Sequence, residues 1–298
     1  MTSAQTSTTA RSTGPWQIAW QRMQRNRAAM IALWGVGIVT LLCVGGFALF
    51  HESQSEQDMN AILQGPGLHH WFGTDNLGRD IFQRVLCGGC ISLLVGIVAT
   101  LVAMVIGLTY GLISGLAGGR VDNLMMRIVD VLYGFPFIAF VILVTVIFER
   151  SLMLLFIAIG AVEWLTTARV VRAQVLALKN QEFILAARTY GADTGRILWR
   201  YMVPNVIGQV VIYASLTVPG IMLMEAALSF LGLGVQPPNS SWGALIQEGA
   251  NNMQTSPWLL IFPGAFFIAT LLALNTLGDA LRDVLDPKSI SDLSRLDH

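Results

Sequence analysis

Charged residues are scarce in this sequence of 298 residues. Asp, Glu, Lys and Arg make up 12% of it, whereas hydrophobic residues make up 54%. Soluble domains carry roughly 25% charged residues, so this composition excludes an ordinary soluble chain and indicates a membrane protein. The formal net charge is zero, so the overall charge gives no reason to expect nucleic acid as a partner.

Histidine is also rare, and the four histidines all lie outside the apolar runs, at positions 51, 69, 70 and 298. No Ser–His pair can therefore form at membrane depth, and the His-Glu-x-x-His zinc pattern is absent. Gly278-Asp279 has no second aspartate deep in an apolar run. These absences argue against an intramembrane protease and against a bound metal.

There are three cysteines. Cys43 lies in an apolar run and is expected to pack there. Cys87 and Cys90 have C-x-x-C spacing, but the surroundings lack the βαβ pattern of a redox motif and a second pair for zinc. A disulfide facing outward remains open, although nothing in the sequence requires it.

The Gly-x-x-x-x-Gly-Lys-Ser/Thr phosphate loop is missing as well. We therefore expect a chain that is not an enzyme, does not hydrolyse ATP and depends on a partner for power. Residues 1–15 lack the apolar core of a signal peptide, so we expect no cleavage and a mobile, cytoplasmic tail.

Long apolar runs are what the sequence does contain. They are about twenty residues long and do not alternate, and lipid admits only helices or closed barrels, so they predict an all-α polytopic membrane protein. A basic, Trp-bearing helix at 16–27 is expected to lie on the membrane lipid. Pro136 should kink the third span or mark a re-entry, and Glu149-Arg150 should form a tight outer turn. Six transmembrane helices are expected, at 28–50, 89–117, 128–148, 152–168, 206–230 and 258–277.

Basic residues are distributed unevenly around these spans. Of the eighteen Lys and Arg residues, fifteen fall in the 1–27 tail, the turn after the second span, the interval 169–204 and the C-terminal tail. Only Arg79, Arg84 and Arg150 fall on the other side. The positive-inside rule therefore predicts that both termini are cytoplasmic and that the loop 51–88 lies outside.

The interval 169–204 is the longest polar stretch between two spans and carries six of the basic residues. It predicts a helix over 180–190 with Asn180 as its cap, ended by Gly191 in the left-handed conformation. Asp193 or Thr194 should cap a second helix that ends at Pro204. Two short helices joined by a glycine-containing turn would form a compact knob between the spans. An ordinary cytoplasmic loop is the alternative interpretation of the same pattern.

Few polar side chains lie within the spans. Charge at membrane depth usually faces a cavity or a partner, so Glu163 is a candidate for the transport pathway, with an interfacial helix-end charge as the alternative. Glu225 is a weaker candidate that also suits packing at the outer end of its span. Tyr133 and Trp164 could line a path, but aromatic residues in spans mostly pack.

Four motifs carry a resemblance to a known family. Ala186-Ala-Arg-Thr-Tyr-Gly191, with Pro204 thirteen residues after the glycine, resembles the "EAA" loop of importer-type ABC transporter permeases, although Leu185 stands at the glutamate position. Phe72-Gly-Thr-Asp-Asn-Leu-Gly-Arg-Asp80 resembles the stretch before the second span in peptide and nickel permeases. Glu225 to Gly243 and Gly278 to Pro287 resemble later motifs of the same subfamily, so the match extends over most of 16–288. It is most similar to C-type permease subunits of oligopeptide importers, and also to those of dipeptide importers.

This resemblance implies a bacterial inner-membrane subunit with an importer-type (MetI-like) permease core at 89–286, preceded by additions at 28–50 and 51–88 and followed by a tail at 287–298. The partners implied are a homologous second permease, two cytoplasmic ATPases that hold ATP and magnesium, and a periplasmic protein that delivers peptide. This chain itself would bind no cofactor. The loop would couple it to the ATPases through Ala186, Ala187, Arg188, Gly191, Ala192 and Asp193. Nickel or another small solute as cargo, an ion-gradient-driven transporter and a purely structural subunit remain as alternatives.

Overall fold

The computed structural model describes residues 15–147 and 152–285, and all regular secondary structure in those ranges is helical apart from one isolated bridge between Thr74 and Asp80. The all-α prediction is confirmed. A 3₁₀ turn at Ser53–Ser55 and a π-helical segment at Leu198–Met202 accompany the α-helices. These are α1 (Pro15–Arg25), α2 (Arg27–Phe50), α3 (Ile81–Ala117), α4 (Gly119–Tyr133), α5 (Phe137–Ile147), α6 (Leu152–Lys179), α7 (Glu182–Thr189), α8 (Thr194–Ile197), α9 (Val203–Phe230), α10 (Trp242–Asn251) and α11 (Trp258–Leu285).

Within the described residues, four helices are long and apolar enough to cross a membrane: α2, α3, the continuous stretch Thr194–Phe230 and Trp258–Val284 of α11. The count becomes five if the bent pair α4–α5 forms one span. The predicted six is therefore not reproduced by length and composition. The remaining long helix, α6, has 28 residues but carries Glu163, Arg169 and Arg172.

Several boundaries differ from those predicted. Helix α3 begins at Ile81 rather than 89, because Asp80 caps it by accepting a hydrogen bond from the Gln83 amide at 3.2 Å. Helix α4 begins directly after Gly118, so the expected basic turn is mostly helix. The break at Pro136 is confirmed, and α4 and α5 meet there at 84°. The predicted turn at Glu149-Arg150 and the C-terminal tail at 287–298 lie outside the described residues. Of the N-terminal tail at 1–27, the structure describes residues 15–27, which include α1.

The centre of the molecule is the packing of α3 against α6. Gly107, Gly111 and Gly115 lie four residues apart on one face of α3, and a Cβ at any of them would come within 2.7 Å of α6 atoms. Small residues at this spacing let two backbones approach closely, as in membrane helix pairs. The two helices therefore form a closely packed unit to which the loop after α6 is attached.

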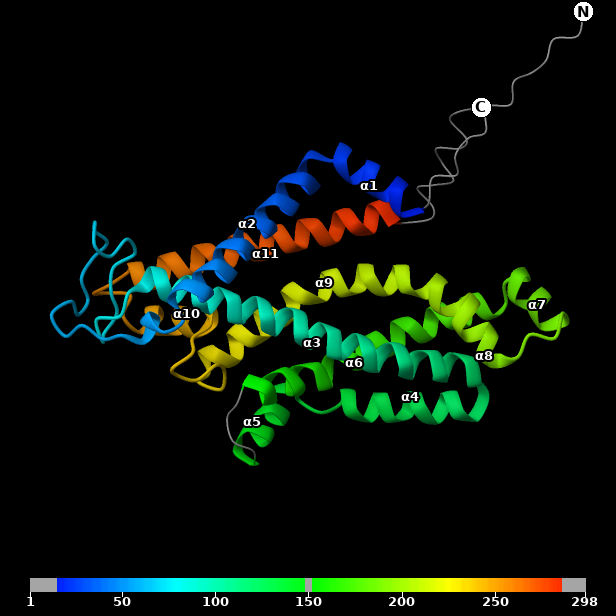
Figure 1. Ribbon diagram of the computed structural model, residues 1–298. Coiled ribbons are helices and arrows are strands. Elements are labelled where there is room, and N and C mark those ends of the chain that lie inside the picture. The colour runs from blue at the N-terminus through cyan, green and yellow to red at the C-terminus, as the bar shows by residue number, and fades with distance from the viewer. Residues whose placement is uncertain (1–14, 148–151, 286–298) are drawn as a thin grey trace, which may run out of the picture.

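The remaining helices surround this pair (Figure 1). Helix α2 packs against α3 and α11, and α9 packs against α3, α6 and α11. Helix α1 packs on α11, where Met23 is buried with Ala280 and Val284. Helices α7 and α8 lie at one end of the molecule, and α10 lies at the opposite end with the loop that precedes α3 (Figure 1).

Candidate functional site

Helix α7 is the short helix of the predicted knob. It spans Glu182–Thr189, and its N-cap residue is Gln181, so the predicted start and cap at Asn180 were wrong. Its end agrees with the prediction, because Gly191 has φ +81°. The Gly191 amide donates to the Arg188 carbonyl at 2.9 Å and the Ala192 amide to the Ala187 carbonyl at 3.0 Å. This pair of bonds is a Schellman motif, which ends a helix and reverses the chain.

The two faces of α7 differ in exposure. Ile184 and Ala187 are buried against the rest of the chain, Ala187 to 8% exposed. Ala186, Arg188 and Leu185 are exposed, and Tyr190 just beyond the helix is 91% exposed. Ala186 and Ala187, both implied as coupling residues, therefore lie on different sides of α7, and Ala187 is packed against the chain rather than open to a partner. Leu185, at the position of the motif glutamate, lies on the open side.

Beyond the turn the chain enters a second helical stretch. Asp193 is the N-cap residue of α8 by backbone conformation, but its side chain makes no capping bond, and its pair with Arg196 at 3.9 Å is exposed. The predicted helix end at Pro204 was wrong, since Thr194–Phe230 is continuous. The π-helical segment before Val203 explains why: its wider turn accommodates a proline that lacks an N–H and crowds the preceding turn. The knob is therefore joined directly to α9.

A buried ion pair, which the sequence did not reveal, lies beside the end of α6. Arg172 donates two hydrogen bonds to the Asp122 carboxylate of α4, from Nε at 2.5 Å and from Nη2 at 2.6 Å. The Ser114 hydroxyl of α3 donates to the same carboxylate at 2.5 Å. Lys179, the last residue of α6, donates to the Leu116 carbonyl at 2.9 Å and so satisfies the end of α3. These contacts join α3, α4 and α6 just before α7 begins.

Two of the four pathway candidates come together at the contact of α4, α6 and α9. The Tyr133 hydroxyl lies 3.1 Å from Thr166 Oγ1, and Thr166 is three residues, about one turn, from Glu163 on α6. Tyr213 of α9 lies in the same region, near Thr166. Arg169 lies 4.4 Å from the centre of the Tyr133 ring and pairs with Asp130 at 2.7 Å. We call Tyr133, Glu163, Thr166 and Tyr213 the polar seam.

The other two candidates lie elsewhere. Trp164 packs edge-on against Tyr110 of α3, with ring centres 4.9 Å apart. Glu225 is fully buried and accepts hydrogen bonds from Ser229 at 2.6 Å and from Ser241 at 2.7 Å. Because Ser241 is the N-cap residue of α10, Glu225 fixes that helix to α9. The alternative interpretation of Glu225 as a packing residue therefore fits its position better than a pathway role.

A second buried charge cluster lies at the end opposite the knob. Asp75 is fully buried, accepts a hydrogen bond from Arg79 Nε at 2.6 Å, and pairs with Arg84 Nη1. Glu248 Oε2 of α10 accepts a hydrogen bond from Arg84 Nη1 at 2.9 Å, and Glu248 Oε1 lies 3.6 Å from Arg79 Nη2. We call Asp75, Arg79, Arg84 and Glu248 the outer charge cluster, a name that follows the orientation predicted from the basic residues. In the sequence, only a resemblance singled out this stretch; in the structure, Gly78, with φ +73°, makes a tight turn here.

The described residues contain no arrangement of three or more His, Cys, Asp or Glu side chains that could hold a metal ion. Cys43 and Cys87 are buried thiols, and Cys90 is a half-buried one. Cys87 Sγ lies 3.7 Å from the Gly46 carbonyl. All three thiols are free, so the structure contains no Cys87–Cys90 disulfide.

Long apolar helices, with an α-helical knob between two of them, define a class of protein: an integral membrane subunit. The chain belongs to the family described as "Binding-protein-dependent transport system inner membrane component", whose model matches residues 107–291. The model "N-terminal TM domain of oligopeptide transport permease C" matches residues 14–66. The chain is thus an inner-membrane component of a transport system of that kind.

Individual relatives agree with this assignment. The oligopeptide transport system permease protein OppC of Escherichia coli (strain K12) is 51% identical over 275 residues, covering 92% of this chain and 91% of the relative. That of Haemophilus influenzae is 48% identical, over 92% of this chain and 88% of the relative. The dipeptide transport system permease protein DppC of Bacillus subtilis is 42% identical, over 91% of this chain and 85% of the relative.

Proposed function

We propose that this chain is the C-type permease subunit of an ATP-driven importer that carries oligopeptides or dipeptides across the inner membrane. The observation that supports the cargo most is the 51% identity, over 92% of the chain, to a permease named for oligopeptide transport. A relative named for glutathione, itself a small peptide, is 42% identical. These names favour peptides over nickel or other solutes.

The proposed complex holds this subunit, a homologous second permease, two cytoplasmic ATPases and a periplasmic peptide-binding protein. ATP and magnesium belong to the ATPases, and this chain binds neither. The knob at the end of α6 is the proposed ATPase contact. Its position supports that role, because α7 is joined to α6 on one side and through α8 to α9 on the other. A push on α7 would therefore reach both long helices.

The proposed pathway contact is the polar seam. It places a carboxylate and three hydroxyls on α4, α6 and α9, within the part of the chain that we propose lies in the membrane. Polar groups at such depth normally face a water-filled path or a partner. The second permease would complete the path on the open side of this seam.

Reconstitution with the ATPases and the binding protein tests the transport proposal. Proteoliposomes should accumulate radiolabelled trialanine only with ATP, and Glu163→Gln should lower uptake or change its dependence on peptide charge without impairing assembly. Uptake driven by an ion gradient without ATP would establish the secondary-transporter alternative. If Glu163→Gln takes up acidic, neutral and basic peptides each at the wild-type rate, Glu163 is not part of the pathway.

Orientation is a separate prediction. With both termini cytoplasmic, a single cysteine at exposed Ser55 in a cysteine-free background should react with an impermeant thiol reagent in spheroplasts. One at exposed Thr194, in the knob, should react only after the membrane is opened. Labelling in the reverse order would invert the topology and place the knob away from any cytoplasmic ATPase.

A further inference from the structure

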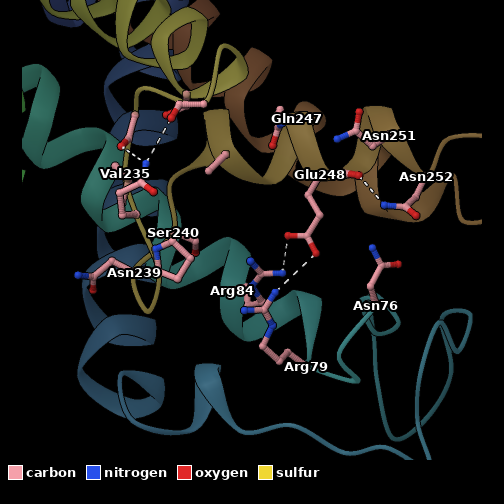
Figure 2. Close-up of a pocket in the computed structure, with 16 residues that line it drawn as sticks. Asn76, Arg79, Arg84, Val235, Asn239, Ser240, Gln247, Glu248, Asn251 and Asn252 are labelled. Atoms are coloured by element: carbon pink, nitrogen blue, oxygen red, sulfur yellow. Dashed lines mark hydrogen bonds and ion pairs between the residues drawn. The ribbon is translucent and has the colours of Figure 1, made fainter. Parts of the chain in front are cut away.

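A polar pocket of about 480 Å³ opens beside the outer charge cluster (Figure 2). This volume falls within the range of small-ligand sites in proteins. The pocket lies between the start of α3, the α9–α10 connection and α10, at the end of the molecule opposite the knob (Figure 1). We call it the outer pocket; the lining residues used below are Asn76, Asn239, Ser240, Gln247, Glu248 and Asn251.

The charged wall of the outer pocket is internally balanced. Figure 2 shows Glu248 reaching from α10 to Arg84 and Arg79, and the buried Asp75 carboxylate holds the same two arginines from behind. Two positive and two negative groups therefore neutralise each other. A ligand with a large net charge would disturb this balance, so the wall favours an occupant that is polar but has little net charge.

Four amides of the lining carry hydrogen-bonding groups that are not engaged elsewhere in the described residues, whereas Ser229, Gln236 and Asn252 are engaged. Asn239 and Gln247 are half-buried, and Asn76 and Asn251 stand exposed at the rim. No side-chain hydrogen bond of these four amides occurs within residues 15–147 and 152–285. Ser240 is 3% exposed, and its buried hydroxyl has no partner in the same ranges. Its oxygen lies against α3, where a Cβ at Gly88 would come within 3.3 Å of it, so the four amides rather than this hydroxyl are open to an occupant.

We propose that the outer pocket binds the main chain of the transported peptide, an inference that rests on the proposed function. A carboxamide donates through its NH₂ and accepts through its oxygen, as a peptide unit does through N–H and C=O. A pocket lined by unpaired amides therefore recognises the part that all peptides share. It places no demand on their side chains.

The lining also favours a passing peptide over a docked segment of the binding protein. Stable protein interfaces are centred on buried aromatic or apolar anchors. Among the residues that the structure describes, no aromatic side chain lines the outer pocket. Neutral hydrogen bonds each contribute little in exchange with water, so a peptide held by them is released readily. Transport requires such release.

Photo-crosslinking in the reconstituted complex tests the proposal directly. With p-benzoyl-phenylalanine at Asn251, on the rim, radiolabelled trialanine delivered by the binding protein should become attached to this chain. The matched control places the crosslinker at Asn60, an exposed amide outside the lining, and should give no peptide adduct. An adduct from position 251 to the binding protein alone would assign the pocket to docking and overturn the proposal.

A second variant measures the contribution of the amides. Asn239→Leu combined with Gln247→Leu should lower uptake at limiting peptide about fivefold to tenfold, the effect of two neutral hydrogen bonds. Attachment of the loaded binding protein should not change. Unchanged uptake, or no peptide adduct from position 251 while the wild type transports trialanine, would refute the pocket and leave the proposed function standing. Absence of ATP-dependent uptake in the wild type would refute the proposed function itself.

Discussion

Replacing Asp75 by alanine is expected to destabilise the outer end of the protein more than any other single change considered. The Asp75 carboxylate accepts hydrogen bonds from the Leu77 amide at 2.8 Å and the Arg79 amide at 2.9 Å, besides its pairs with both arginines. Its removal leaves the buried Arg84 with Glu248 alone. Breaking a buried pair in this way costs about 3–5 kcal/mol. Thermal unfolding of the detergent-purified complex should show the loss.

Asp58→Ala is the matched control. Asp58 is also a turn aspartate of the same loop, but it is exposed, and its Oδ1 accepts one hydrogen bond, from the Asn60 amide at 2.9 Å. Its loss should cost no more than about 1 kcal/mol. Equal unfolding temperatures for the two variants would mean that the outer charge cluster contributes nothing to stability.

Local signals were sufficient for part of this architecture. Helix α2 and the centre of α11 were evident from apolar length alone, and the end of α7 from Gly191, because only glycine takes a positive φ without strain. The Asp80 cap of α3 is an equally local feature, since it depends only on the aspartate and on the Gln83 amide three residues later. Each of these features is determined by residues that are close together in the sequence.

Long-range pairing accounts for what was missed. The charged stretch from Arg169 to Lys179 was interpreted as loop, whereas it is the last part of α6, because Asp122 and the end of α3 satisfy Arg172 and Lys179. Glu248 lies 164 residues from Arg84 in the sequence. No local pattern links such residues.

The face of α7 that packs inward could have been predicted from local spacing. Ile184 and Ala187 are three residues apart and therefore share a face of the helix, and the larger apolar side chain indicates which face packs inward. Because Ala186 and Ala187 are adjacent, they point to different sides of the helix and cannot form one contact surface. The correction moves the proposed docking surface to the side that carries Leu185, Ala186 and, beyond the helix, Tyr190.

The second large effect is expected on this open side of α7, as weaker attachment of the ATPase. Ala186→Trp should leave insertion, thermal stability and pairing with the second permease unchanged, since residue 186 is exposed. The indole would obstruct the proposed contact with the ATPase, and loss of a central contact of about 2 kcal/mol or more corresponds to roughly 30-fold weaker attachment. ATPase stoichiometry, ATP hydrolysis and trialanine uptake, measured together in the reconstituted complex, should reveal uncoupling.

Ala187→Trp, one residue further along the same helix, separates docking from folding. Residue 187 is 8% exposed, so the indole must displace α7 from its seat, and overpacking of this kind costs about 1–3 kcal/mol. This variant should therefore lose both thermal stability and coupling, whereas Ala186→Trp loses coupling alone. If Ala186→Trp retains normal stoichiometry, hydrolysis and uptake, the open face of α7 is not the ATPase contact. Coupling would then have to pass through another part of 169–204.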